Sequence, residues 1–294
     1  MDSHAFECYV KAGKICSEAR SYGVSLITPG ASILVVNKAV EAKIRELGGE
    51  LAFPVQISVN HVAAHYCPDP DDDTAFKEGD LCKLDLGVHI DGYIADTAIT
   101  VDLGDNAALV KASKDACDAA LALIKPGVPF RALGRAIQDT ITAAGFAPIK
   151  NLGGHGLSQF TIHDSLINVP NYDNHDETLI AEGMAFAVEP FATTGKGMVA
   201  EQNQGNIYCF AQRKPVRNPY GRKVLDQVER FHGLPFTTHQ LTIPQKAAEM
   251  GLRELLANGA VHAYPPLVEV QKGFVSQHEH TVIIHNGKAL ITTR

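Results

Sequence analysis

The residues of this chain best suited to chemistry are two aspartates in the segment 83–101, KLDLGVHIDGYIADTAITV. The Asp-Gly pair at 91–92 is a strong signal for a two-residue turn, so the segment predicts a β-hairpin. In that register Asp85 pairs with Ala98, and Asp96 lies on the same face because side chains alternate along a strand. Diagonal neighbours of this kind lie about 7–8 Å apart. Two carboxylates so close in an apolar strand pair are costly unless a cation joins them; the alternative is one buried aspartate and one solvated aspartate in a loop.

Three further residues have the types and settings of metal ligands. His155 follows two glycines in NLGGHGLS, where missing side chains would let the backbone approach a bound group, and a neutral imidazole is a common ligand. Glu189 in FAVEPF and Glu279 in VSQHEHTVII interrupt apolar strands, where a glutamate is seldom left unpaired. The alternative for both glutamates is a solvated position on an edge strand.

Together the five residues offer four carboxylates and one imidazole. Two divalent cations would balance the four negative charges, and such an oxygen-rich shell suits Mn, Fe(II), Co or Zn at a hydrolytic site. Two metals about 3.5–4 Å apart can ionise a shared water at neutral pH. The set therefore predicts a hydrolytic metal centre, provided that the fold brings these separated residues together.

A diverged internal repeat predicts the elements that would do so. Each copy has a Pro-Gly pair, an amphipathic helix that ends at a glycine, and a Glu-Gly pair that opens a strand with a carboxylate. This order predicts two similar α+β halves that face one central cleft. The matching pieces are the helices 31–48 and 128–145, and the strands that carry Asp85 and Glu189.

The remaining elements complete this organisation. Further helices are expected at about 4–22 and 107–124, and the Asn-Gly pair at 286–287 predicts a final hairpin. Between 209 and 263 the sequence becomes helix-like and has no counterpart in the first half, so we expect a helical insertion there.

The composition excludes several classes of function. The chain has 294 residues, a hydrophobic fraction of 45% and a net charge of −7, which argue against nucleic acid as the main partner. No apolar run is long enough to span a membrane, and the N-terminal segment lacks the pattern of a secretory signal. Six cysteines form no Cys-X-X-Cys pair and suit reduced cytoplasmic thiols. Lys14, Lys83 and Lys111 are expected to be solvated.

Ordered motifs along the chain resemble those of the methionine aminopeptidases, within the wider creatinase-like "pita-bread" metallohydrolases. The matching segments are KLDLG, DTAITV, GGHGL, TIHD, AVEPFATTGKG and QHEHTV. AFPVQISVNHVAAHY, VHAYPPL and the helical insertion are similar to the type 2 branch in its short archaeal form. The resemblance implies an α+β pita-bread fold of two pseudo-symmetric halves, with a catalytic domain over 1–208 and 264–294 and a winged-helix-like insertion over 209–263.

Carried over motif by motif, the resemblance implies a role for each candidate ligand. Asp85 would chelate one metal, whereas Asp96 and Glu279 would bridge both. His155 and Glu189 would complete the shell of the other metal. The two divalent ions would be Co, Mn, Fe(II) or Zn.

The same resemblance implies the catalytic and substrate-binding residues. Glu189 would also shuttle a proton, His163 would contact the scissile amide and the developing oxyanion, and His65 would lie beside the substrate and stabilise the intermediate. The methionine pocket would use Phe53, His65, Ile162, His163 and Tyr264. Ile207 stands where eukaryotic type 2 members have a pocket histidine, so we expect a different pocket shape but the same chemistry.

The implied function is removal of the initiator methionine from nascent proteins in the cytoplasm, through attack of a metal-bridged hydroxide on the first peptide bond. A small second residue would be preferred. The partners would be polypeptides that start with Met; contact with the ribosome stays open, DNA and membrane are not expected, and a monomer is the expected state. Two alternatives remain: a proline-specific peptidase of the same fold, and a non-catalytic homologue that binds RNA or proteins.

Overall fold

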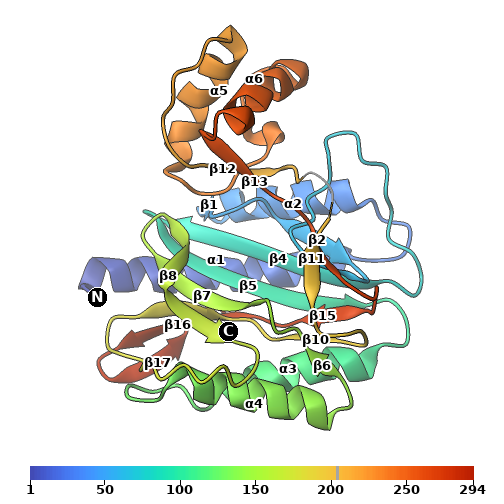
Figure 1. Cartoon of the computed structure of the whole chain (residues 1–294), viewed down its shortest axis with the longest axis vertical. Helices are drawn as coiled ribbons and strands as arrows, with labels where there is room; N and C mark the ends of the chain where they lie inside the picture. The colour runs from blue at the N-terminus through green and yellow to red at the C-terminus, as the bar shows by residue number, and fades with distance from the viewer. Residues whose placement is uncertain (203–204) are drawn as a thin grey trace.

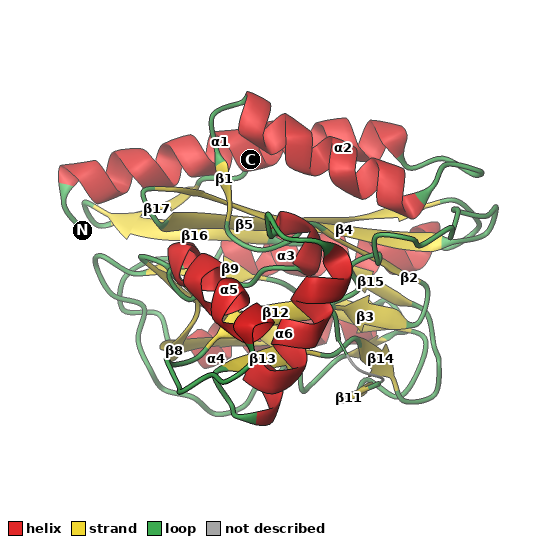
Figure 2. Cartoon of the chain, turned by 90° about the horizontal axis from the view of Figure 1, so that it is seen from above, coloured by secondary structure: helices red, strands yellow, loops and turns green. Residues whose placement is uncertain are grey.

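The computed structural model describes residues 1–202 and 205–294, and it has an α+β fold in which helices lie on both sides of a layer of strands (Figures 1 and 2). Helices α1 and α2 lie on one side of that layer, and α3 and α4 on the other. The expected helices are confirmed with longer or shorter ends: α1 Ser3–Leu26, α2 Ile33–Glu46, α3 Ala107–Leu121 and α4 Phe130–Ala143.

Local signals explain why the helices begin and end where they do. Asp2 caps α1 by accepting a hydrogen bond from the Ala5 amide at 2.8 Å, and Ser32 caps α2 in the same way. Gly48 and Gly145 follow α2 and α4 with φ angles of 82° and 86°, a left-handed conformation that ends a helix at little cost for glycine. The Pro-Gly and Gly signals therefore predicted both helices correctly.

The first half is a four-stranded antiparallel sheet packed under α1 and α2. Its central hairpin has the predicted register: Asp85 pairs with Ala98, and Asp96 pairs with Gly87. The turn residue Asp91 has a φ of 50°, as a two-residue hairpin turn requires. The strands are β1 Glu50–Leu51, β2 Gln56–Val59, β4 Leu81–Ile90 and β5 Tyr93–Asp102.

The second half places a five-stranded sheet against α3 and α4. Its strands follow the order β17-β16-β9-β7-β8, and the Asn286 turn joins β16 to β17 as expected. Each half has its own apolar core, in agreement with the repeat. The strands are β7 Gly153–Ser158, β8 Thr161–Pro170, β9 Ala185–Val188, β16 His280–His285 and β17 Lys288–Ile291.

Two neighbouring chain segments, around Glu189 and Glu279, each pass from this five-stranded sheet to a smaller sheet. The sequence predicted one strand through Glu189, but β9 ends at Val188 and the chain resumes as β10, because Pro190 cannot donate a ladder hydrogen bond. Strand β9 pairs with β16, whereas β10 pairs with β15, so Glu189 and Glu279 both lie where the chain changes sheets. The smaller sheets contain β3 Val62–Ala64, β6 Ala147–Pro148, β10 Phe191–Thr193, β11 Val199–Glu201, β14 Leu267–Glu269 and β15 Val275–Gln277.

The segment expected to be an insertion packs its helices on each other at one end of the molecule (Figure 1). Helices α5 (Pro219–Val228) and α6 (Gln245–Ala257) are accompanied by two 3-10 turns, Glu229–Phe231 and Thr238–Gln240. The flanking strands β12 (Ile207–Phe210) and β13 (Val261–Tyr264) pair with each other. Across 1–202 and 205–294, no helix combines the length and the apolar character that a membrane span needs.

Candidate metal centre

A cavity of about 370 Å³ lies between the two halves and is lined by the residues that the sequence analysis singled out. All five candidate ligands line it: Asp85, Asp96, His155, Glu189 and Glu279. So do the other expected site residues: Phe53, His65, Ile162, His163, Ile207 and Tyr264. The cavity thus joins polar groups from both halves with an apolar wall.

The candidate ligands approach one another closely at the polar end. One ligand atom from each of Asp96, His155 and Glu279 lies within 4.8 Å of the others. The Nε2 atom of His155 is 3.8 Å from Asp96 Oδ2 and 3.7 Å from Glu189 Oε1. These contacts are too long for hydrogen bonds, and they leave room between the groups.

Backbone pairing between the halves fixes two of these carboxylates. The Asp96 amide donates to Thr281 Oγ1 at 2.7 Å, and the Thr281 hydroxyl donates back to the Asp96 carbonyl at 2.8 Å. The Glu279 amide donates to the Ala98 carbonyl at 2.9 Å. Asp96 and Glu279 are both almost fully buried, so their positions are set by the backbone segments that carry them.

The sequence analysis missed Gln277, whose amide group joins three of the acids. Its Nε2 lies 3.3 Å from Asp85 Oδ2, 3.2 Å from Glu189 Oε2 and 3.4 Å from Glu279 Oε2. The signal was present in the sequence, because Gln277 precedes Glu279 by two residues and alternation favours the same face. An amide that donates to several carboxylates orients them as a group.

Burial makes this collection of acids expensive in the absence of a cation. It raises the pKa of Asp85 to about 7, and burial together with the neighbouring carboxylates raises the pKa of Asp96, Glu189 and Glu279 well above the usual range. Burial, followed by the nearby His163, lowers the pKa of His155 to about 3. His155 is therefore a neutral imidazole with a lone pair to offer.

The polar atoms left without hydrogen-bond partners fit a bound cation. Asp85 Oδ1, Asp96 Oδ1 and Glu279 Oε1 are buried and accept no hydrogen bond. Buried oxygens of this kind are rarely left unsatisfied, whereas divalent cations bind carboxylate oxygen and imidazole nitrogen directly. The donor set of four carboxylates and one neutral imidazole therefore suits divalent metal.

Beside the acids, the aromatic rings of three histidines and one tyrosine line the cavity. The rings of His155 and His163 meet edge to face with centroids 4.5 Å apart, and those of His65 and Tyr264 with centroids 5.6 Å apart. His65 has a φ of 65°, and its amide donates to Gln56 Oε1 at 2.8 Å, which holds this uncommon backbone conformation. Burial lowers the pKa of His65 to about 4, so the ring is neutral.

The apolar wall is made by buried side chains from separate elements. Phe53, Ile162 and Ile207 are all at most 7% exposed. His61 does not line the cavity. A compact apolar wall next to convergent polar groups is the usual composition of a small-molecule site.

Glycines 153 and 154 line the cavity, and they also make room for neighbouring strands: a Cβ at Gly154 would lie 2.1 Å from the Ala187 carbonyl oxygen. One expectation was wrong in detail. Lys83, expected to be solvated, is 1% exposed and donates to the carbonyls of Asn60, Leu81 and Val275 at 3.0–3.3 Å. Alternation in β4 places Lys83 on the same face as Asp85. The expectation of a solvated lysine relied on its charge and ignored this alternation.

Comparison with known proteins agrees with this geometry. The sequence matches the metallopeptidase family M24 over residues 7–286. A methionine aminopeptidase of Archaeoglobus fulgidus is 45% identical over 295 residues, and one of Methanocaldococcus jannaschii is 43% identical over 296 residues; each alignment covers 100% of both chains.

Solved structures share the fold at lower identity. The crystal structure of methionine aminopeptidase from Thermotoga maritima matches with a TM-score of 0.73 and 22% identity, covering 100% of this chain and 98% of that chain. Prolidase from Pyrococcus furiosus matches with a TM-score of 0.63 and 20% identity, covering 100% and 64% respectively.

A pita-bread fold with a buried acidic pocket defines a metal-dependent hydrolase. The chain belongs to metallopeptidase family M24. As a member of that family it is an enzyme that binds divalent metal and acts on polypeptides.

Proposed function

We propose that this protein is a methionine aminopeptidase of the type 2 branch, which removes the initiator methionine from nascent polypeptides in the cytoplasm. The observation that carries the proposal is the cavity in which four buried carboxylates and a neutral histidine meet an apolar wall. Relatives named methionine aminopeptidase, 37–45% identical and aligned over nearly the whole chain, support methionine over other N-terminal residues. The helices over 219–257 and the YPPL segment favour type 2.

The metal site is a pair of divalent ions, drawn from Co, Mn, Fe(II) or Zn. Asp85 would hold one ion, His155 and Glu189 would hold the other, and Asp96 and Glu279 would serve both. The charge of four carboxylates balances two such ions, and the unpartnered oxygens of Asp85, Asp96 and Glu279 support this assignment. When bound, such ions polarise the scissile carbonyl and lower the pKa of water at the site.

Residues of the chain perform the proton transfers and orient the substrate. Glu189, held by the Gln277 amide, accepts the proton from water and delivers it to the leaving amine. His163 donates a hydrogen bond to the oxygen of the scissile carbonyl as negative charge develops there. His65 lies beside it and stabilises the same intermediate.

The apolar wall selects the methionine side chain. Phe53, Ile162 and Tyr264 line the cavity with His65 and His163, and an unbranched thioether can fill such a pocket. The acidic end attracts the free ammonium of the substrate. The residue after methionine must fit beside His65 and His163, so a small side chain is preferred.

The proposal includes a division of the chain that positions these groups. The catalytic domain comprises 1–208 and 264–294, and 209–263 forms a helical insertion that shapes the pocket through Ile207 and Tyr264 at its two junctions. The enzyme acts as a monomer.

The deciding experiment compares two peptides on metal-stripped enzyme, with each candidate cation added back in turn. One peptide is Met-Ala-Ser, and the other is an X-Pro peptide, in which proline follows a first residue other than methionine. We expect release of methionine from the first peptide and no cleavage of the second. Preference for the X-Pro peptide would assign the chain to the proline-specific branch instead. Absence of turnover with every cation, in protein that binds metal, would overturn a peptidase function.

A further inference from the structure

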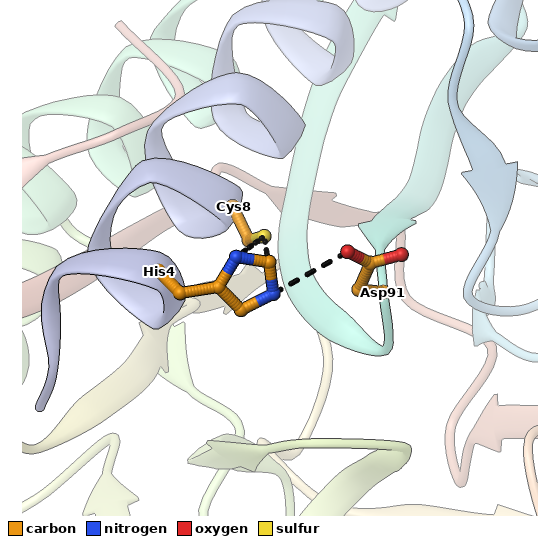
Figure 3. Close-up of side chains that lie close together, drawn as sticks. All are labelled: His4, Cys8 and Asp91. Carbon is orange, nitrogen blue, oxygen red and sulfur yellow. Dashed lines mark hydrogen bonds and ion pairs between the residues drawn. The ribbon is translucent and has the colours of Figure 1, made fainter.

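A second group of metal-ligating side chains lies outside the cavity, where helix α1 meets the tip of the β4–β5 hairpin (Figure 3). His4 and Cys8 are one helical turn apart on α1, and Asp91 occupies the hairpin turn. One ligand atom of each residue lies within 4.8 Å of the others. None of the three lines the catalytic cavity.

The ligand atoms lie near enough to share one ion after a turn of the exposed His4 ring. His4 Nε2 is 3.6 Å from Cys8 Sγ and 3.3 Å from Asp91 Oδ2, and Cys8 Sγ is also 4.0 Å from His4 Nδ1. The sulfur therefore lies beside the face of the imidazole ring. Rotation of this exposed ring would aim the Nε2 lone pair at an ion held about 2.3 Å from the sulfur and about 2.0 Å from the nitrogen and the carboxylate oxygen.

The cluster spans the boundary between core and surface. Cys8 is buried, whereas His4 and Asp91 are exposed. A bound divalent ion would displace the thiol proton and neutralise the resulting thiolate and the Asp91 carboxylate together.

We propose that His4, Cys8 and Asp91 form a peripheral site for one divalent cation of the zinc class, with water in the open fourth position. A set of one imidazole, one thiolate and one carboxylate suits Zn²⁺ or Co²⁺ better than Mg²⁺ or Ca²⁺. Binding forms the metal–sulfur bond and releases the thiol proton to solvent. The ion would join α1 to the hairpin whose strands carry Asp85 and Asp96.

The competing explanation is that these contacts need no ion. His4 and Asp91 are both well exposed, so their contact can be an ordinary surface pair of small energy, and Cys8 can be a core thiol beneath it. That explanation predicts that the three residues retain no metal. It also predicts that their substitution changes no metal spectrum.

Cobalt spectroscopy separates the two explanations without using activity as the readout. We would titrate the metal-stripped full chain with Co²⁺, past the amount that restores turnover, and record the near-ultraviolet sulfur-to-cobalt charge-transfer band. No cysteine lines the catalytic cavity, so this band reports only on a thiolate site elsewhere. We expect the band in the wild-type protein, and its loss in His4→Ala and Cys8→Ser.

Matched variants make the result decisive. Glu7→Gln removes one negative charge from the same helix without removing a ligand, so the band should persist. Asp91→Asn keeps the turn and should weaken cobalt binding at least about tenfold. His4 is exposed, so His4→Ala tests the site even if Cys8→Ser fails to fold. No sulfur band in the wild type, or a band unchanged in His4→Ala, would overturn the proposal.

Discussion

Asp96 and Thr281 exchange two hydrogen bonds across the boundary between the two halves of the molecule. The Asp96 amide donates to the Thr281 hydroxyl at 2.7 Å, and that hydroxyl donates to the Asp96 carbonyl at 2.8 Å. Thr281 is fully buried, and it belongs to β16, whereas Asp96 belongs to β5. The Thr281 hydroxyl thus makes the hydrogen bonds that a neighbouring strand would make to the backbone of Asp96, and it holds this candidate metal ligand in place.

The first prediction follows from this exchange. Thr281→Val keeps the shape but leaves a buried N–H and a buried C=O of Asp96 without partners, which should lower the free energy of unfolding by about 2–5 kcal/mol. Thr281→Ser keeps the hydroxyl and should cost less. Chemical denaturation of the three proteins checks the order. Equal stability of the valine and serine variants would show that the hydroxyl contributes nothing.

The second prediction concerns the two carboxylates assigned to both metals. Asp96→Ala and Glu279→Ala should abolish methionine release, because each removes a ligand that no neighbouring group can replace. Both variants should also bind less metal when analysed after dialysis. Asp115→Ala, which removes a half-buried carboxylate on α3 that pairs with Lys111 outside the cavity, is the control and should retain full activity. Full turnover in either active-site variant contradicts the assignment.

The third prediction concerns Gln277, which donates to three acids of the centre. Gln277→Leu removes the donor but keeps a side chain of similar size, so the acids lose their common orientation. Loss of such an outer partner should weaken metal binding by about 10–100-fold. Competition with a chelator measures the affinity. An unchanged affinity would mean that the backbone alone positions the carboxylates.

How far the sequence predicts this molecule depends on which interactions decide each feature. The hairpin register came from a local turn signal and strict alternation, so Asp85 and Asp96 were placed correctly. Gln277 and the buried Lys83 were missed because their partners lie in distant strands or on backbone carbonyls. The break at Glu189 had a local signal in Pro190, but the change of sheet was missed because it depends on pairing with the distant strands β15 and β16.

The fourth prediction is a dependence of stability on pH in the metal-free enzyme. Folding raises the pKa of Asp85 to about 7, and it raises those of Asp96, Glu189 and Glu279 too. An acid whose pKa rises on folding contributes stability that is complete below its unfolded pKa of about 4 and is lost as pH rises through the folded value. Buried neutral histidines such as His65 and His155 act in the opposite direction only below their unfolded pKa of about 6.5, so the comparison is made above that value. The chelator-treated protein should therefore melt at a lower temperature at about pH 8.5 than at about pH 7.

Added metal should reverse this trend, because the ligands bind it in their deprotonated forms. Thermal melts with chelator and with saturating metal, at the same two pH values, provide the measurement. Metal-free Glu279→Gln, which removes one of the four charges, should show a smaller loss at high pH. A metal-free protein that melts at the same temperature at both pH values, in wild type and variant alike, would contradict the pKa shifts.

The last prediction tests the apolar wall separately from the metal centre. Gly87 lies opposite Asp96 in the hairpin, and a Cβ there would lie 2.3 Å from the ring of Phe53. Gly87→Ala should therefore displace Phe53 into the cavity, which raises the KM for peptides that begin with methionine while metal content stays unchanged. A variant that also replaces Phe53 with leucine frees space for the new methyl group and should recover part of the loss. If Gly87→Ala instead lowers metal content and leaves the KM unchanged, the ring of Phe53 is not part of the methionine pocket.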